Sequence, residues 1–227
     1  MLRLGLGALA HANWHAAYYS HENDQWNELS VLQAAHAAEI LIKARIAEEH
    51  PLLIFEQLPK AREEGQKISF LRLLGDGRTI LYRDLPDRLW ATTGIHLADL
   101  ENFKEFGFLR NMVQHFAAPT EIDLSQRTLE FIFGVIDPFI NQCWDEFAID
   151  FNEDHEPYEY FAPVLLAREI EFLVSPECAY DFRHMRIEWP KNGVYRNTME
   201  RRFADALAVH NELYDTSGSF PVKRDTA

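Results

Sequence analysis

Cysteine is scarce in this chain of 227 residues, which contains only Cys143 and Cys178. Two cysteines among apolar and aromatic neighbours exclude a disulfide-stapled scaffold, and we interpret them as buried free thiols of a cytoplasmic protein. Glycine and proline number ten each, too few for a collagen-like or low-complexity chain. Hydrophobic residues make up 47%, enough for the core of one large domain or of a domain with an appendage.

Long apolar runs are also missing, since no stretch approaches the roughly 20 residues that cross a membrane. The first ten residues resemble a signal peptide only in a short apolar run. The aromatic residues that follow, Trp14, Tyr18 and Tyr19, fit a packed helix better. We therefore expect a mature cytoplasmic N-terminus and no membrane partner.

Positive charge is in short supply, because 22 Lys and Arg oppose 36 Asp and Glu for a formal net charge of −14. This balance argues against a broad basic face for nucleic acid, since an acidic protein repels phosphate at long range. It leaves room for a locally basic cleft, which Lys43, Arg45, Lys104 and Arg110 could line. An acidic surface would equally suit a basic partner protein, and acidic residues crowd into the stretch 145–159.

Nucleotide-binding and nucleophile motifs are absent. The pairs Gly5-x-Gly7 and Gly75-x-Gly77 lack the strand, phosphate loop and lysine that such motifs need. No nucleophile elbow or cysteine-protease pattern is present. We expect no cofactor.

Two groups of residues have the chemistry of metal ligands. His11 and His15 are spaced for a pair on one helix, but no H-E-x-x-H pattern accompanies them. The acidic stretch offers four further candidates: Asp150, Asp154, His155 and Glu159. A solvated acidic loop explains this second group better, so we expect no metal site.

Apolar residues recur at helical spacing over most of the chain, so we predict an all-α protein. Asn23 or Asp24 can cap a long helix that Pro51 ends, and Pro119 stops another. Pro138 should kink the apolar helix in which it lies. The expected helices cover about residues 8–19, 24–49, 84–90, 97–116, 122–149, 158–172 and 195–213.

Other segments are predicted to be less regular. Residues 52–57 should add one helical turn, and 59–66 form a polar loop. The apolar run and turn signal of 70–77 could make a small hairpin, although irregular structure or short helices are favoured. The aromatic residues of 178–189 fit a strand or a loop, and the tail from about 215 is expected to be disordered.

The acidic segment 150–157 has the composition of a linker. We predict one helical bundle over residues 1–150 and a C-terminal helical extension packed on it over 151–227. No internal repeat is present in the sequence.

The segment 108–116 places an arginine, polar amides and a histidine on one predicted helix. Arginine can hold a phosphate with two parallel donors, and histidine can move a proton near neutral pH. These groups suffice to cleave RNA without a metal, because RNA supplies the 2'-hydroxyl as nucleophile.

Arg110 and His115 lie about 140° apart around a helix. Asn111 shares a stripe with His115, and Gln114 shares one with Arg110. A second copy related by a two-fold axis could complete the site.

The run from Leu109 to His115 resembles the R-N-x-x-x-H signature of HEPN domains, helical ribonucleases of prokaryotic toxins, CRISPR effectors and phage-defence proteins. Residues 34–56 resemble the long first helix of that fold and the turn after it. Residues 79–85 resemble the entry to a following short helix. The resemblance covers about 24–145. It implies a HEPN-like helical bundle, a homodimer and metal-independent RNA cleavage, with a neutralising antitoxin or defence protein as a further partner.

Three residues of the motif are expected to be catalytic. His115 would take the proton from the 2'-hydroxyl or give one to the leaving 5'-oxygen. Arg110 would stabilise the charge of the phosphorane-like transition state. Asn111 would orient the histidine or a phosphate oxygen. The ordinary alternative is a helix-surface ion pair and a core histidine.

Four more residues are candidates for substrate binding: Lys43, Glu39, Gln114 and His36. Glu39 and Lys43 are i,i+4 neighbours, so they either stabilise their helix alone or also border the cleft and position Arg110. His36, one turn before Glu39, could join them.

Two other functions stay open. The same helix could build a dimer or dock a partner without catalysis, and the surroundings of His115 should then be acidic. A metal-dependent helical hydrolase that uses the N-terminal histidines is the third option, which metal analysis of the protein would decide.

Overall fold

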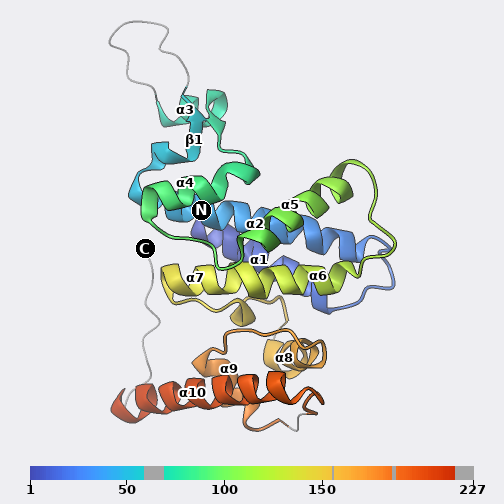
Figure 1. The fold of residues 1–227 in the computed structure, drawn as a ribbon. Coiled ribbons are helices and arrows are strands. Elements are labelled where there is room, and N and C mark those ends of the chain that lie inside the picture. Colours follow the sequence, from blue (N-terminus) through green and yellow to red (C-terminus); the bar gives the residue numbers. More distant parts are fainter. Residues whose placement is uncertain (59–68, 155, 186–187, 218–227) are drawn as a thin grey trace, which may run out of the picture.

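The computed structural model describes residues 1–58, 69–154, 156–185 and 188–217, and it is all-α apart from two short strands (Figure 1). The longer helices are α1 (Leu2–Ala17), α2 (Trp26–Glu49), α4 (Leu85–Thr93), α5 (Leu100–His115), α6 (Leu124–Phe131), α7 (Asp137–Trp144), α8 (Pro157–Ala167) and α10 (Gly193–Ser217). The shorter elements are the helices α3 (Phe70–Asp76) and α9 (Pro176–Phe182), the strands β1 (Phe55–Gln57) and β2 (Arg78–Thr79), the 3-10 turns Pro51–Ile54, Tyr82–Asp84 and Ala148–Asp150, and the π-helical turn Ile132–Ile136.

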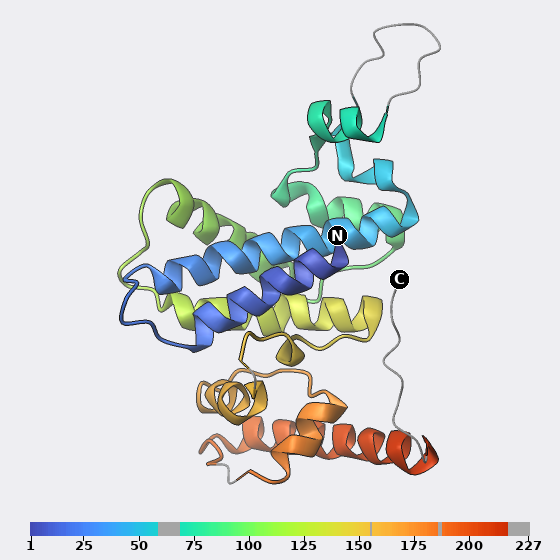
Figure 2. The same cartoon turned by 180° about the vertical axis from the view of Figure 1, so that it is seen from behind.

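The long helix α2 is the centre of the bundle. It contacts α1, α4, α5 and α6. Figure 2, the view from behind, shows that α1 runs antiparallel to it. The helices α8, α9 and α10 form a further layer under α6 and α7 (Figure 1). A single hydrophobic core joins both parts, with Phe103 and Phe131 buried in the first and Phe161 and Phe172 in the second. In the described part of the chain, no helix combines the length and apolar character needed to cross a bilayer.

Small residues let α1 and α2 pack closely. Ala34, Ala35 and Ala38 are buried on α2. On α1, a Cβ added at Gly5 would lie 2.7 Å from the Leu41 side chain. Alanine has the highest helix propensity and no long side chain, so one run of sequence both forms the helix and allows the close approach.

The single helix expected over 122–149 is wrong in detail, because α6 and α7 are separated by a π-helical turn. Pro138 has no N–H to donate to the carbonyl of Gly134, and its ring crowds that oxygen. The turn before it therefore widens into π-helix at Ile132–Ile136. The helix then ends at Trp144, where Asp145 adopts a left-handed φ of 56°.

Helix ends also differ from the expected ones. Helix α1 begins at Leu2 rather than at about residue 8. Helix α5 begins at Leu100, because the Asp99 side chain accepts a hydrogen bond from the N–H of Asn102 at 3.0 Å and caps it. Helix α8 ends at Ala167 rather than near 172, just before Glu169 takes a left-handed φ of 55°.

Two assignments of type are wrong. The helical turn expected over 52–57 is confirmed for Leu52–Ile54, which belong to the 3-10 turn Pro51–Ile54, and it is wrong for Phe55–Gln57, which form a strand that pairs antiparallel with Arg78–Thr79. The strand or loop expected over 178–189 contains a helix, α9, which Ser175 caps by accepting from the N–H of Cys178 at 3.2 Å. A serine followed by proline is a helix start signal, and the aromatic residues after it concealed this.

At the C-terminal end, α10 extends to Ser217, two residues past the approximate position at which the tail was expected to begin. Residues 218–227 lie outside the described ranges, as does the loop expected at 59–66.

The acidic stretch is largely built into the fold, so the solvated loop expected there is wrong for Asp150 and Asp154. Asp150 accepts hydrogen bonds from the hydroxyls of Tyr158 and Ser175 at 2.8 and 2.6 Å. Asp154 accepts from the Tyr18 hydroxyl at 2.7 Å. These contacts tie α1, α8 and α9 together.

Candidate functional site

Helix α5 carries the motif arginine, and its guanidinium is held by three neighbours. Arg110 Nη1 donates to Asn111 Oδ1 at 2.9 Å, and Nη2 lies 3.8 Å from Glu39 Oε2. The guanidinium carbon is 5.8 Å from the centre of the Tyr82 ring. The side chain stays 28% exposed, so it is oriented by protein contacts and still reachable by a ligand.

Glu39 and Lys43 form an ion pair on α2 that lies behind Arg110. Lys43 Nζ is 2.6 Å from Glu39 Oε1 and donates to Thr79 Oγ1 at 3.1 Å. Lys43 is buried beside Glu39 and neutralises its charge. It does not line the neighbouring pocket. Of the cleft residues expected from sequence, Arg45 also lies elsewhere, paired with Glu49 at 2.8 Å.

A pocket of 390 Å³ opens beside Arg110. Its lining includes Arg83, Lys104 and Arg110, and no described acidic side chain contributes to it. Arg83 is paired with its neighbour Asp84 at 3.5 Å, whereas Lys104 is exposed on the turn of α5 before the motif. In a chain with a net charge of −14, three cations around one pocket make a local site for an anion.

The floor of this pocket is aromatic. Tyr82 stacks on Phe103 with the ring centres 4.4 Å apart. Burial raises the pKa of the Tyr82 phenol far above its usual range, although Arg110 acts in the opposite direction. The phenol is therefore neutral at physiological pH. Tyr82 is also the closest neighbour of Gly107, where an added Cβ would lie 2.6 Å from the Tyr82 ring.

We expect Gly107→Ala to destabilise the protein, because the new methyl group would push Tyr82 from its place. Overpacking costs about 1–3 kcal/mol, which outweighs the gain of up to about 1 kcal/mol from alanine in a helix. Gly7→Ala on α1 is the matched control, since nothing lies within 4 Å of its added Cβ. Urea unfolding should show a lower free energy of unfolding for Gly107→Ala and an unchanged or higher one for Gly7→Ala. Equal values for the two variants would contradict the close contact.

The other motif residues lie at the C-terminal end of α5. His115 is the last residue of the helix and Gln114 precedes it; both are exposed, and neither forms a hydrogen bond or ion pair within the described ranges. His36 on α2 is likewise exposed and without such a contact there. The fold thus brings together Arg110, Asn111, Glu39 and Lys43, and it leaves the two histidines and Gln114 facing solvent.

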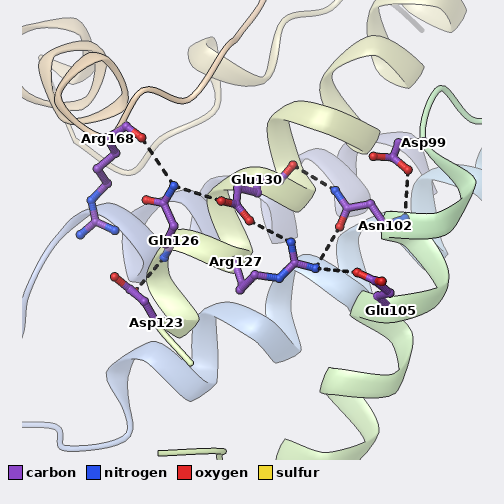
Figure 3. Close-up of polar contacts among 8 residues, drawn as sticks. All are labelled: Asp99, Asn102, Glu105, Asp123, Gln126, Arg127, Glu130 and Arg168. Atoms are coloured by element: carbon purple, nitrogen blue, oxygen red, sulfur yellow. Dashed lines mark hydrogen bonds and ion pairs between the residues drawn. The ribbon is translucent and has the colours of Figure 1, made fainter. Parts of the chain in front are cut away.

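The opposite end of α5 has the opposite charge (Figure 3). Arg127 on α6 donates to Glu130 at 2.8 Å and to Asn102 at 3.4 Å, and it lies 3.5 Å from Glu105. This network joins the first turns of α5 to α6. The pocket of 480 Å³ beside it is lined by six acidic residues: Asp99, Glu101, Glu105, Glu130, Glu169 and Glu171. Arg127 is the one basic side chain among its described lining residues, so this pocket repels phosphate.

Thiol chemistry is excluded by the environment of the cysteines. Burial raises the pKa of Cys143 to about 11 and that of Cys178 well above its usual value. Both are free and mostly protonated at neutral pH, so neither is an activated nucleophile.

The N-terminal histidines form no cluster with the acidic stretch beyond one pair. His11 Nδ1 lies 2.8 Å from Glu153, and His15 Nδ1 lies 2.7 Å from the carbonyl of His11. Within the ranges 1–58, 69–154, 156–185 and 188–217, no three His, Cys, Asp or Glu residues are placed to hold a metal ion. His155 lies outside them.

No protein-family model, curated protein or solved structure matches this chain. The likeness to HEPN domains therefore stays a hypothesis that rests on the motif and its surroundings.

The sequence did not point to Tyr82 or Gly107 as part of the site. One signal was available for Gly107, because a glycine inside a helix and next to the motif often marks a close packing contact. Tyr82 reaches the pocket from a different segment, and only the folded chain brings it there.

Proposed function

We propose that the chain is a metal-independent endoribonuclease of the HEPN type. The observation that supports it best is the charge of the pocket at Arg110, which gathers three cations in an acidic protein. A ribose-phosphate strand needs such a place, because its affinity comes mostly from contacts to phosphate. Asn111 and Glu39 orient the guanidinium in advance, so a bound phosphate meets a fixed pair of donors.

The proposed reaction uses the 2'-hydroxyl of the RNA. Its oxygen attacks the adjacent phosphorus and gives its proton to a neutral histidine, while the bond from phosphorus to the 5'-oxygen breaks and a protonated histidine gives that oxygen a proton. The products are a 2',3'-cyclic phosphate and a 5'-hydroxyl. Arg110 stabilises the charge on the non-bridging oxygens, and His115 is the proton carrier. Lys104 and Gln114 contact the strand, and Lys43 acts through Glu39.

The experiment is cleavage of single-stranded RNA in excess chelator. We expect cutting to persist and the upstream fragments to carry a 2',3'-cyclic phosphate. Loss of all activity in chelator, with recovery on adding a divalent cation, would contradict the mechanism.

A homodimer is part of the proposal, because one helix directs Arg110 and His115 only partly to a common point. Phe108 and Phe116 support it, since they flank the motif and are 66% and 89% exposed. Large apolar side chains that stay in water beside a functional helix are typical of an interface.

We expect Phe116→Ser to weaken this dimer and leave the fold unchanged, because the side chain is almost fully exposed. Leu71→Ser on α3 is the control with a similarly exposed apolar residue (83%) outside the motif helix. Sedimentation measurements should show a larger monomer fraction for Phe116→Ser and no change for Leu71→Ser. A wild-type protein that is monomeric at all concentrations would overturn the dimer.

The second candidate function is a non-catalytic module that dimerises or docks a partner through α5. The same exposed Phe108 and Phe116 favour it, as does the acidic pocket at the other end of the helix. A protein that dimerises but does not cleave RNA would support this second function. A role as a toxin or phage-defence effector with a neutralising partner rests on the resemblance to HEPN proteins alone, whereas the proposed cytoplasmic location rests on the N-terminal sequence and the free cysteines.

A further inference from the structure

A pocket of 420 Å³ lies between α9 and α10, in the layer farthest from α5 (Figure 1). Its lining residues are Glu177, Tyr180, Asp181, His210, Asn211 and Tyr214. It shares no residue with the pocket at Arg110, and the proposed ribonuclease reaction makes no use of it.

The wall of the pocket is a stack of rings. His210 lies between Tyr180 and Tyr214, with ring centres 4.3 and 4.2 Å away. The guanidinium carbon of Arg183 lies 3.8 Å from the centre of the Tyr180 ring. The chain therefore already holds one guanidinium against this stack by a cation–π contact.

The imidazole in the middle of the stack lacks a partner. His210 is only 7% exposed, and its Nδ1 atom is buried with no hydrogen bond among the described residues. An unsatisfied buried polar atom destabilises the folded state, because it has lost its hydrogen bonds to water. Such atoms are rare in folded proteins and call for an explanation. A ligand that brings a donor into this pocket would supply the missing hydrogen bond.

The pocket is also negatively charged. Glu177 and Asp181 are i,i+4 neighbours on α9, and neither side chain forms an ion pair with a described residue. No lysine or arginine is among the described lining residues. Two carboxylates beside aromatic rings, together with His210 in the tautomer whose Nδ1 accepts, call for a ligand that is cationic, rich in N–H donors and able to stack.

We propose that this pocket binds a guanidinium group, such as that of an arginine side chain. A guanidinium is planar, carries five donors in a fixed fork and stacks on aromatic rings, whereas an ammonium is a compact and strongly hydrated charge. Two of its donors would pair with Asp181 and Glu177. Since Nδ1 of His210 is closed off from solvent, a third donor reaches it only when the stack around it opens.

The test is a titration of the whole protein with N-acetyl-arginine amide, followed by tyrosine fluorescence and by the ¹⁵N shifts of the histidine rings. We expect saturable binding with a dissociation constant of about 1 mM. The Nδ1 resonance of His210 should move as it accepts a hydrogen bond. The double variant Glu177→Gln, Asp181→Asn should weaken binding at least tenfold, and His210→Phe should weaken it while keeping the stack. Asp205→Asn, which removes one negative charge on α10 outside the pocket, should leave binding unchanged.

Spermidine is the second ligand and separates guanidinium from ammonium. We expect it to bind at least tenfold more weakly than the arginine derivative. Equal affinity for the two ligands, binding that survives the double variant, or no saturation by about 50 mM would each overturn the proposal. These results are independent of RNA cleavage, so they test the pocket whether or not the protein is a ribonuclease.

Discussion

His115→Ala should lower the rate of RNA cleavage by about 10²–10⁴-fold, the usual contribution of a positioned acid or base. The fold should not change, because His115 is exposed at the end of α5 and contacts no described residue by hydrogen bond or ion pair. The measurement is the initial rate on a single-stranded RNA in excess chelator, at matched protein concentration and with circular dichroism as a check of folding. His21→Ala, another exposed histidine, is the control and should retain full activity.

Arginine variants separate the charge of Arg110 from its geometry. Arg110→Ala should lower the rate by about 10²–10³-fold, because it removes a contact to the developing charge. Arg110→Lys keeps the charge and loses the paired donors, so its rate should fall between alanine and the wild type. Glu39→Gln should reduce activity less than Arg110→Ala, since Glu39 acts only by orienting the guanidinium from 3.8 Å. Full activity in both His115→Ala and Arg110→Ala would exclude the motif as the catalytic site.

Asp137→Asn should destabilise the protein by about 1–3 kcal/mol, the cost of an unsatisfied buried donor. Asp137 is fully buried at the start of α7, and its two oxygens accept from the N–H groups of Ala148 and Leu173, each at 2.8 Å. It thereby joins α7 to the turn at 148–150 and to the chain between α8 and α9. An asparagine side chain offers only one acceptor oxygen. Its NH₂ group would face the second backbone N–H, so two donors would meet without an acceptor between them.

The stability of the wild type should also depend on pH through this residue. Burial raises the pKa of Asp137 to about 7 and that of Asp150 to about 6, above the usual value near 4. In the folded state both groups hold protons that the unfolded chain has lost between about pH 4 and 7. The contribution of these two groups to the free energy of unfolding should therefore be largest below about pH 4. It should fall as the pH rises through 7.

Urea unfolding at pH 5, 6, 7 and 8 measures this effect. The decrease should amount to a few kcal/mol in the wild type and be clearly smaller in Asp137→Asn, so the two curves approach each other at high pH. Asp145→Asn is the control, because Asp145 is exposed and asparagine tolerates its left-handed φ. A wild-type stability that rises from pH 5 to 8, with Asp137→Asn unchanged, would refute the assignment.

The two ends of α5 explain how an acidic protein can offer a site for phosphate. Asp99, which caps it, and Glu101 and Glu105 in its first turns line the acidic pocket, whereas Lys104 in the same turns and Arg110 in its second half line the basic one. Net charge describes the whole surface, whereas a bound phosphate responds mainly to charges within about 10 Å at physiological salt. The overall value of −14 is thus no measure of the charge at Arg110.

The sequence by itself determined the all-α class and the approximate position of most helices, because helix formation follows from the local periodicity of apolar residues. It also singled out the Glu39–Lys43 pair and the motif on α5, since i,i+4 neighbours meet whatever the rest of the chain does. The prediction from sequence missed α9. It also assigned a helical turn to Phe55–Gln57, which form β1 because their backbone hydrogen bonds depend on β2, a strand 21 residues later.

Only the tertiary structure decided which residues surround the motif. Tyr82 joins Arg110 from another segment, Lys43 turns out to be buried, and the acidic stretch packs against α1 and α9. The same holds for the stack around His210, whose members come from two helices. The physical reason is common to all of them: contacts between distant segments depend on how the helices pack, and local sequence periodicity carries no information about that packing.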